Sequence, residues 1–245
     1  LVFYFLIESI FCCNMFNETC RCSRFKFNQK NYDIVICDSP SDELKTFPNV
    51  TNYPNINKEI IYLIDLSNKN FKIIQNFTFN SIKIEKISLM NNQLEFIEEY
   101  AFYGIDDLIS LDLRKNNLNY VRINFLTSLE EIILQNNKFE YIDENIFLNL
   151  KNLIKINLII NNIKYISENA FKTNVALRFL LINLNKLETI KIENLMNIEL
   201  LELGANHIFQ NISIKNLPKL QNLTLTSNNI YEIRTENFQN LTNLK

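Results

Sequence analysis

The sequence predicts an α/β solenoid, in which short coils stack side by side and each adds one strand to a parallel sheet on a concave face. The first observation is the spacing of apolar residues in LEEIILQNNKFEYI, residues 129–142, which matches neither a helix stripe nor a strand alternation. The second is that this spacing recurs, and each copy carries an asparagine at the same place. These asparagines are Asn92, Asn116, Asn137, Asn161, Asn185, Asn206 and Asn228, spaced 21 to 24 residues apart. The third is that all five cysteines precede the repeats.

Each predicted strand contains two apolar residues separated by one other residue, as in Ile132 and Leu134. Alternate residues of a strand point to the same side, so this pair faces the inside of the coil. One coil cannot bury that side alone, whereas stacked coils share a continuous core. Eight such units begin at residues 61, 84, 108, 129, 153, 177, 198 and 220.

The recurring asparagine is predicted to lie where the chain turns out of the strand. Its amide can satisfy backbone groups that the turn leaves unpaired, and successive amides would form a ladder. Lys69 occupies this position in the first coil and cannot accept a hydrogen bond, so we expect that coil to be irregular. A second apolar anchor lies ten residues after the ladder position. These anchors are Phe79, Phe102, Phe147, Phe171, Leu195 and Phe238.

The combined pattern, L-x-x-L-x-L-x-x-N-x-L, resembles the leucine-rich-repeat family. The resemblance implies a horseshoe-shaped leucine-rich-repeat solenoid with a parallel sheet on the concave face and an irregular convex side with short helical segments. It also implies that the anchor phenylalanines fill the convex side. The seventh unit departs from the pattern at its last position, where Asn211 replaces an apolar residue.

The cysteines form the pattern C-x6-C-x-C-x14-C, from Cys13 through Cys20 and Cys22 to Cys37. This cluster resembles the cysteine-rich N-terminal cap of extracellular leucine-rich-repeat proteins. Four cysteines allow three pairings, and the resemblance implies Cys13–Cys22 and Cys20–Cys37. A zinc site of four cysteines is the alternative, although the C-x-C pair does not favour it. Cys12 is left over, and it could exchange roles with Cys13.

The chain is expected to divide into three parts. Residues 1–12 form an apolar run that is too short to span a bilayer and suits a truncated signal peptide, with a buried strand as the alternative. Residues 13–52 form the cap, and residues 53–245 contain the eight repeats and the start of a ninth. We therefore expect a fragment whose missing C-terminal segment is the only possible means of membrane attachment.

The sequence offers no catalytic or cofactor site. Its only histidine, His207, directly follows a ladder asparagine, which predicts an exposed turn residue. The two glycines, Gly104 and Gly204, are too few for a phosphate-binding loop. The formal net charge of −2 gives no reason to expect nucleic acid as a partner. We expect a non-enzymatic protein without a cofactor or a metal.

The candidate binding surface is the concave face. Residues that project there are mostly polar in coils two to four and become apolar from coil four onward, before coil eight returns to polar residues. The predicted partner-binding residues are Ile133, Ile159, Phe179, Leu181, Leu184 and Leu200, with Ile160 beside them. An apolar patch of this kind is typical of a partner site. The alternative is that a composition rich in Ile and Phe places such residues everywhere.

Six N-x-[ST] sequons are consistent with secretion. They are Asn17, Asn49, Asn76, Asn211, Asn222 and Asn240. The resemblance implies an extracellular, secreted or cell-surface module that binds a protein ligand as a receptor ectodomain or a secreted adhesion or signalling protein. The alternative is a structural protein of the extracellular matrix.

Overall fold

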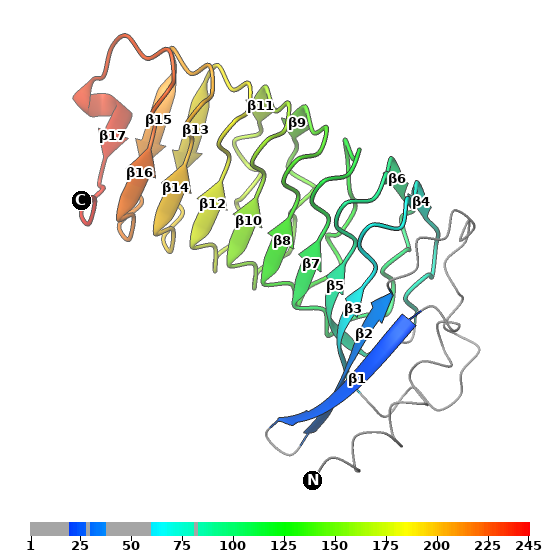
Figure 1. The fold of residues 1–245 in the computed structure, drawn as a ribbon. Coiled ribbons are helices and arrows are strands. Elements are labelled where there is room, and N and C mark those ends of the chain that lie inside the picture. Colours follow the sequence, from blue (N-terminus) through cyan, green and yellow to red (C-terminus); the bar gives the residue numbers. More distant parts are fainter. Residues whose placement is uncertain (1–19, 28–29, 38–59, 81–82) are drawn as a thin grey trace. The chain divides into compact units, whose positions relative to one another are not determined.

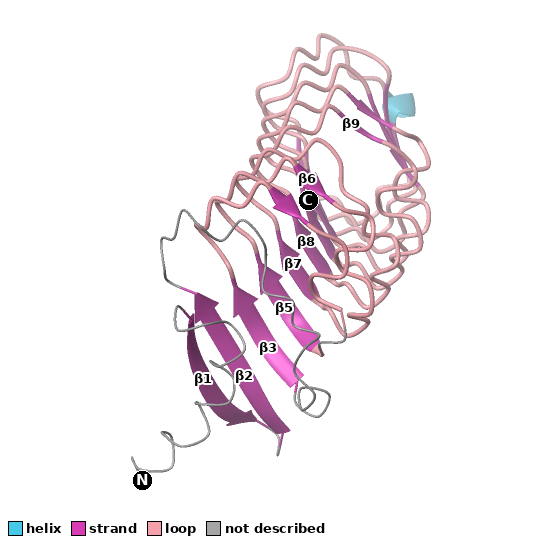
Figure 2. Cartoon of the chain, turned by 90° about the vertical axis from the view of Figure 1, so that its right-hand side faces the viewer, coloured by secondary structure: helices cyan, strands magenta, loops and turns pink. Residues whose placement is uncertain are grey.

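The computed structural model describes residues 20–27, 30–37, 60–80 and 83–245. The chain divides into two compact units, residues 1–116 and 117–245. In each unit, coils wind in parallel, with strands on one side and mostly loops on the others (Figure 2). The fold is the expected parallel-strand solenoid, and its coils follow the predicted units.

The first unit begins with an antiparallel hairpin and continues as parallel strands in the order β1-β2-β3-β5-β7. Its main strands are β1 (Cys20–Phe27), β2 (Lys30–Cys37), β3 (Ile60–Asp65), β5 (Ile84–Ser88) and β7 (Ser110–Asp112). A second, two-stranded sheet joins β4 (Ile73–Ile74) to β6 (Phe96–Ile97). The pairing of β2 with β3 contains a register shift between Asp33 and Ile34.

The second unit carries five parallel strands in the order β8-β10-β12-β14-β16 (Figure 1). They are β8 (Glu131–Ile133), β10 (Lys155–Asn157), β12 (Phe179–Leu181), β14 (Leu200–Glu202) and β16 (Asn222–Thr224). Shorter parallel strands pair on the opposite side of the coils, where we expected only loops and turns. They are β9 (Tyr141–Ile142) with β11 (Tyr165–Ile166), and β13 (Ile190–Glu193), β15 (Ile212–Lys215) and β17 (Phe238–Gln239).

Helical structure is nearly absent from the described residues. It is limited there to one turn of 3-10 helix, η3 (Thr235–Asn237). The side opposite the main strands is therefore built from loops and short parallel strands, with less helix than the resemblance implied. No helix in the described part of the chain is long and apolar enough to cross a membrane.

The core lies inside the coils and is built from the predicted apolar positions. In β8 the central Ile132 is fully buried while its neighbours Glu131 and Ile133 are half-exposed. The anchor phenylalanines stack between coils, with ring centroids of Phe147 and Phe171 separated by 5.9 Å. Burial of each such side chain contributes about 1.5 to 3 kcal/mol. The anchors Leu195 and Phe238 are less enclosed.

The asparagine ladder is confirmed. The Asn161 Oδ1 accepts a hydrogen bond from the Phe139 backbone N–H at 3.1 Å, and its Nδ2 donates to the carbonyls of Leu134 and Leu158 at 3.0 Å. The other members likewise accept from a backbone N–H and donate to backbone carbonyls. They are Asn92, Asn116, Asn137, Asn185, Asn206 and Asn228.

The first coil is more regular at its turn than Lys69 led us to expect. Its backbone follows the usual path, because the Asn68 N–H donates to the Met90 carbonyl at 3.0 Å, as Ile160 does to Asn183 at 3.1 Å. The reason is that the first coil receives its hydrogen bonds from the asparagine of the second, since the Asn92 Oδ1 accepts from the Lys69 N–H at 2.9 Å. The irregularity lies instead in the register shift between β2 and β3.

The residue before each ladder position has a left-handed backbone in all eight coils, a feature that sequence reasoning missed. The values of φ are 61° at Asn68, 54° at Asn91, 55° at Lys115, 57° at Asn136, 55° at Ile160, 58° at Leu184, 53° at Ala205 and 56° at Ser227. Asparagine adopts this conformation readily, whereas a β-branched residue such as Ile160 does so at a cost of about 1 to 2 kcal/mol. Ile160 and Leu184 are also exposed, by 41 % and 50 %.

Candidate functional site

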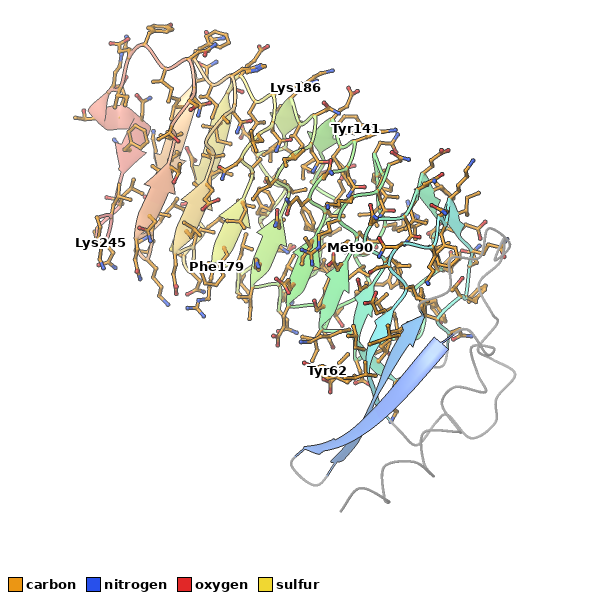
Figure 3. All side chains as sticks on the ribbon, in the orientation of Figure 1. Tyr62, Met90, Tyr141, Phe179, Lys186 and Lys245 are labelled. Carbon is orange, nitrogen blue, oxygen red and sulfur yellow. The ribbon has the colours of Figure 1, made fainter. Side chains whose placement is uncertain are left out.

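The outward face of β12 and β14 carries the most compact group of predicted binding residues. The strand register pairs Phe179 with Leu200, and Leu181 projects from the same face of β12 two residues after Phe179. All three are half-exposed, while the central residues of both strands, Leu180 and Leu201, are fully buried. Figure 3 labels Phe179 beside β12. We call Phe179, Leu181 and Leu200 the apolar sheet cluster.

The remaining predicted residues lie apart from this cluster. Ile133 is separated from Leu181 by Asn157, which the register places between them. Ile159 follows the end of β10, and Leu184 lies in the left-handed turn after β12 rather than on a strand. The structure therefore replaces the continuous patch that the sequence suggested with a three-residue cluster and isolated apolar residues around it.

Ion pairs border the apolar sheet cluster. The Lys155 ammonium lies 2.8 Å from the Glu131 carboxylate in the same row of the sheet as Phe179. The Arg178 guanidinium binds both oxygens of Glu199, at 2.8 and 2.9 Å, and lies over the Phe179 ring at 5.2 Å from its centroid. Because both charges of each pair are satisfied internally, the border of the apolar sheet cluster is nearly neutral.

The Arg178–Glu199 ion pair shifts the pKa of both of its members. The hydrogen bond from the Arg178 guanidinium, assisted by its charge, holds the pKa of the Glu199 carboxyl below its ordinary range. The same contacts raise the pKa of Arg178. Because the Arg178 side chain is about half exposed, this pair contributes little to the stability of the fold.

The described sequons differ in their surroundings. Asn222 lies on β16 directly beside Leu200 in the register, and its side chain is exposed. Asn76, Asn211 and Asn240 lie outside the main sheet and are exposed. Asn17 and Asn49 lie outside the described residues. A glycan on Asn222 would border the apolar sheet cluster.

The cysteine prediction is only partly within the described structure. The hairpin places Cys20 opposite Cys37 and Cys22 opposite Val35. Cys12 and Cys13 lie outside the described residues. The register describes the backbone alone, so both predicted disulfides, Cys13–Cys22 and Cys20–Cys37, stay predictions.

A polar cavity of about 590 Å³ lies on the other side of the second unit. Lys191, Glu193, Ser213 and Lys215 of β13 and β15 line it, together with Tyr165. Sequence reasoning missed this cavity because it assigned no sheet to this side. The signal that could have indicated it is the short apolar alternation in IKIE and ISIK.

The described residues contain no cluster of three or more histidine, cysteine or acidic side chains that could hold a metal ion. His207 is exposed after the ladder residue Asn206, where the sequence placed it.

A family model described as a BspA type leucine-rich repeat region matches residues 55–178 with six copies. The chain belongs to the leucine-rich-repeat family. No curated protein matches it. The sequence resemblance was therefore correct for the repeats, and the ladder continues beyond the matched residues through Asn185, Asn206 and Asn228.

Solved structures share this leucine-rich-repeat fold. A crystal structure of the TLR13–ssRNA13 complex is 25 % identical with a TM-score of 0.61, covering 71 % of this chain and 27 % of that one. The octameric complex of Latrophilin 3, Unc5D and FLRT2 (LRR) is 19 % identical with a TM-score of 0.61, covering 76 % and 58 %. The glycosylated Toll–Spatzle complex of Drosophila is 19 % identical with a TM-score of 0.61, covering 72 % and 30 %. The chain thus spans between about a quarter and three-fifths of the length of these neighbours.

Proposed function

We propose that this leucine-rich-repeat chain is an extracellular, non-catalytic module that binds a protein ligand through the apolar sheet cluster. The observation that carries the proposal is the adjacency of Phe179, Leu181 and Leu200 on neighbouring strands of a rigid sheet. Large apolar side chains contribute most to binding when surrounding contacts exclude water from them. Here the paired charges of Arg178 and Glu199 supply a border of this kind.

Two further observations support an extracellular protein ligand. The structural neighbours include Toll in complex with Spatzle and FLRT2 in complex with Unc5D and Latrophilin 3. The predicted cap pairs Cys20 opposite Cys37 in the hairpin register, which suits an oxidised disulfide. One structural neighbour is bound to single-stranded RNA. We do not propose RNA binding for this chain, because its net charge of −2 gives no general attraction for phosphates.

The binding proposal is tested by screening the chain, as a multivalent fusion, against an array of secreted and cell-surface ectodomains. A partner should bind the wild-type chain and lose at least tenfold in affinity with Phe179→Glu. Tyr141→Glu is the matched control, because Tyr141 is 59 % exposed and lies on the opposite side of the coils (Figure 3). A partner that tolerates Phe179→Glu and is lost with Tyr141→Glu would place the site on the other side.

The extracellular setting is tested separately by the oxidation state of the cap. Mass mapping of the secreted chain should find two disulfides among residues 13 to 37, including Cys20–Cys37. Free thiols at all of these positions, or bound zinc, would contradict the extracellular assignment while leaving the sheet face as a binding surface.

A further inference from the structure

The turn at residues 75–78 differs from the equivalent turns of other coils in a way that folding does not explain. In coils two, four and five the residue seven places after the ladder position is Glu99, Glu144 or Glu168. In the first coil it is Asn76, which is exposed in the turn. The position two residues later holds Thr78, which completes the sequon Asn76-Phe77-Thr78.

Thr78 stands in a position that the other coils fill with apolar side chains. Ala101, Ile146 and Ala170 occupy it there, and all are buried. Thr78 is 7 % exposed, and its hydroxyl is satisfied by donating to the Gln75 carbonyl at 2.7 Å. A hydroxyl at a buried position brings no packing advantage over alanine and requires this extra hydrogen bond. The sequon, in contrast, requires the hydroxyl.

The geometry of Asn76 leaves its amide nitrogen available for a covalent attachment. Its Oδ1 accepts a hydrogen bond from the Tyr100 backbone N–H at 2.8 Å, and its own backbone N–H donates to the Glu98 carboxylate at 2.6 Å. Its Nδ2 makes no hydrogen bond with any part of the chain that the structure describes. N-glycosylation replaces one hydrogen of Nδ2 and leaves Oδ1 unchanged, so the bond to Tyr100 would persist. At Asn240, by comparison, Nδ2 donates to the Asn216 Oδ1 at 2.6 Å.

Three exposed aromatic rings surround this turn. Phe77, Tyr100 and Tyr103 are exposed by 46 %, 45 % and 54 %. The ring centroids of Phe77 and Tyr100 are 5.9 Å apart with nearly parallel planes, and Tyr103 meets both rings edge-on at 6.0 and 6.2 Å. We call these three residues the aromatic triad. Phe77 holds a left-handed φ of 61°, an unfavourable conformation for a bulky residue.

The triad is specific to the coils that surround the sequon. The positions equivalent to Phe77 and Tyr100 in coils four and five hold Asn145 and Asn169. A contiguous exposed group of rings is typical of a surface that contacts another group. A glycan on Asn76 would lie next to these rings, because Asn76 directly precedes Phe77 in the chain. The C–H bonds of a sugar ring are weakly positive and can pack against the negative faces of aromatic rings.

We propose that Asn76 carries an N-linked glycan whose first sugar packs against the aromatic triad of Phe77, Tyr100 and Tyr103. The glycan then covers apolar surface that the fold leaves exposed and fastens the turns of the first two coils to each other. The inference rests on the extracellular setting of the proposed function, since only a secreted chain meets the glycosylation machinery. It does not depend on which face binds a partner.

The experiment begins with occupancy. The chain, expressed behind a secretion leader in glycosylating eukaryotic cells, is mapped by mass spectrometry before and after enzymatic release of N-glycans. Asn76 should be occupied in most molecules, and Asn76→Gln and Thr78→Ala should both remove that glycan. In protein produced without glycosylation, Thr78→Ala should leave the unfolding midpoint unchanged or raise it, because alanine occupies the equivalent position in coils two and five. An unoccupied Asn76, or a large loss of stability with Thr78→Ala in unglycosylated chain, would overturn the proposal.

Packing against the triad is tested in denaturant unfolding by comparing the glycosylated chain with the Thr78→Ala variant, which lacks the glycan but keeps the hydrogen bond from Tyr100 to Asn76. The glycan should shift the unfolding equilibrium roughly fivefold toward the folded state, the size of one aromatic packing contact. In a Tyr103→Ala background this shift should largely disappear, whereas the matched control Tyr141→Ala, which removes an exposed ring of the second unit, should preserve it. An equal shift in both backgrounds would overturn the packing. None of these measurements uses a partner, so failure of the sheet cluster to bind a protein would leave them unaffected.

Discussion

Replacement of Asn161 by alanine tests the ladder that joins the coils. The change removes three hydrogen bonds to backbone groups of the same and the preceding coil. The carbonyls of Leu134 and Leu158 each keep a second asparagine donor, Asn137 at 3.1 Å and Asn185 at 3.0 Å. Only the Phe139 N–H loses its partner completely.

The expected loss follows from this count. One buried donor without a partner costs about 1 to 3 kcal/mol, and each of the two weakened carbonyl interactions adds about 0.5 kcal/mol or more. We therefore expect Asn161→Ala to lower the free energy of unfolding by about 3 kcal/mol. Urea unfolding followed by circular dichroism measures this value, with the slope of the transition checked for two-state behaviour.

Two control variants make the result specific. Asn162→Ala, one residue away and without side-chain hydrogen bonds of the ladder type, should change the free energy of unfolding by less than about 0.5 kcal/mol. Asn228→Ala removes the equivalent bonds in the partly exposed eighth coil, where water can replace them, and should cost about 1 kcal/mol. Equal losses at Asn161 and Asn162 would refute the reasoning.

Four further changes test other parts of the structure. Phe179→Glu should leave the free energy of unfolding within about 0.5 kcal/mol of wild type, because the ring lies on the outward face; failure to fold would place it in the core. Ile160→Asn should raise the free energy of unfolding by about 1 kcal/mol by relieving the left-handed isoleucine, and a loss of stability would contradict that assignment. Phe147→Ala should lower it by about 3 to 5 kcal/mol in the same unfolding assay, and a loss below half of that would show a loosely packed anchor. Arg178→Met should raise the pKa of Glu199 in an NMR titration, because the guanidinium lowers that pKa in the wild type. In the wild type, the stabilisation by the ion pair is present above the ordinary carboxyl pKa and should be lost as the pH falls through the lowered pKa of Glu199. The variant should lack this pH dependence.

The sequence was sufficient to predict the solenoid, the ladder and the anchors, because each recurs at the same position in successive units. A recurring position can be distinguished from residues that are frequent only because the chain is rich in them. Asn161 and Phe147 could be assigned roles for this reason. The left-handed residue before each ladder position was missed because its signature is inconsistent. Asparagine occupies it at Asn136, but Ile160 and Leu184 occupy it in the next two coils.

The candidate site was predicted less completely than the fold. Choosing outward residues by their position in each coil selected Phe179 and Leu200, which the strand register places opposite each other. It treated the apolar residues as a single patch because it considered each coil separately. The register shows that Asn157 interrupts the row between Ile133 and Leu181. The second sheet and the aromatic triad depend on contacts between coils outside the main repeat pattern, and these leave little trace in any one unit.

The hydrogen bonds of the ladder also give the stack a polarity. Each asparagine accepts from an N–H of the coil before it, as Asn161 does from Phe139 and Asn185 does from Ile163. Substitution of one asparagine therefore destabilises mainly the preceding coil, which loses a hydrogen-bond acceptor. The coil that contains the substitution keeps its hydrogen bond to the asparagine of the next coil. Local opening would spread toward the N-terminus from the altered residue, and a map of amide protection would place the damage about one repeat upstream of the mutation.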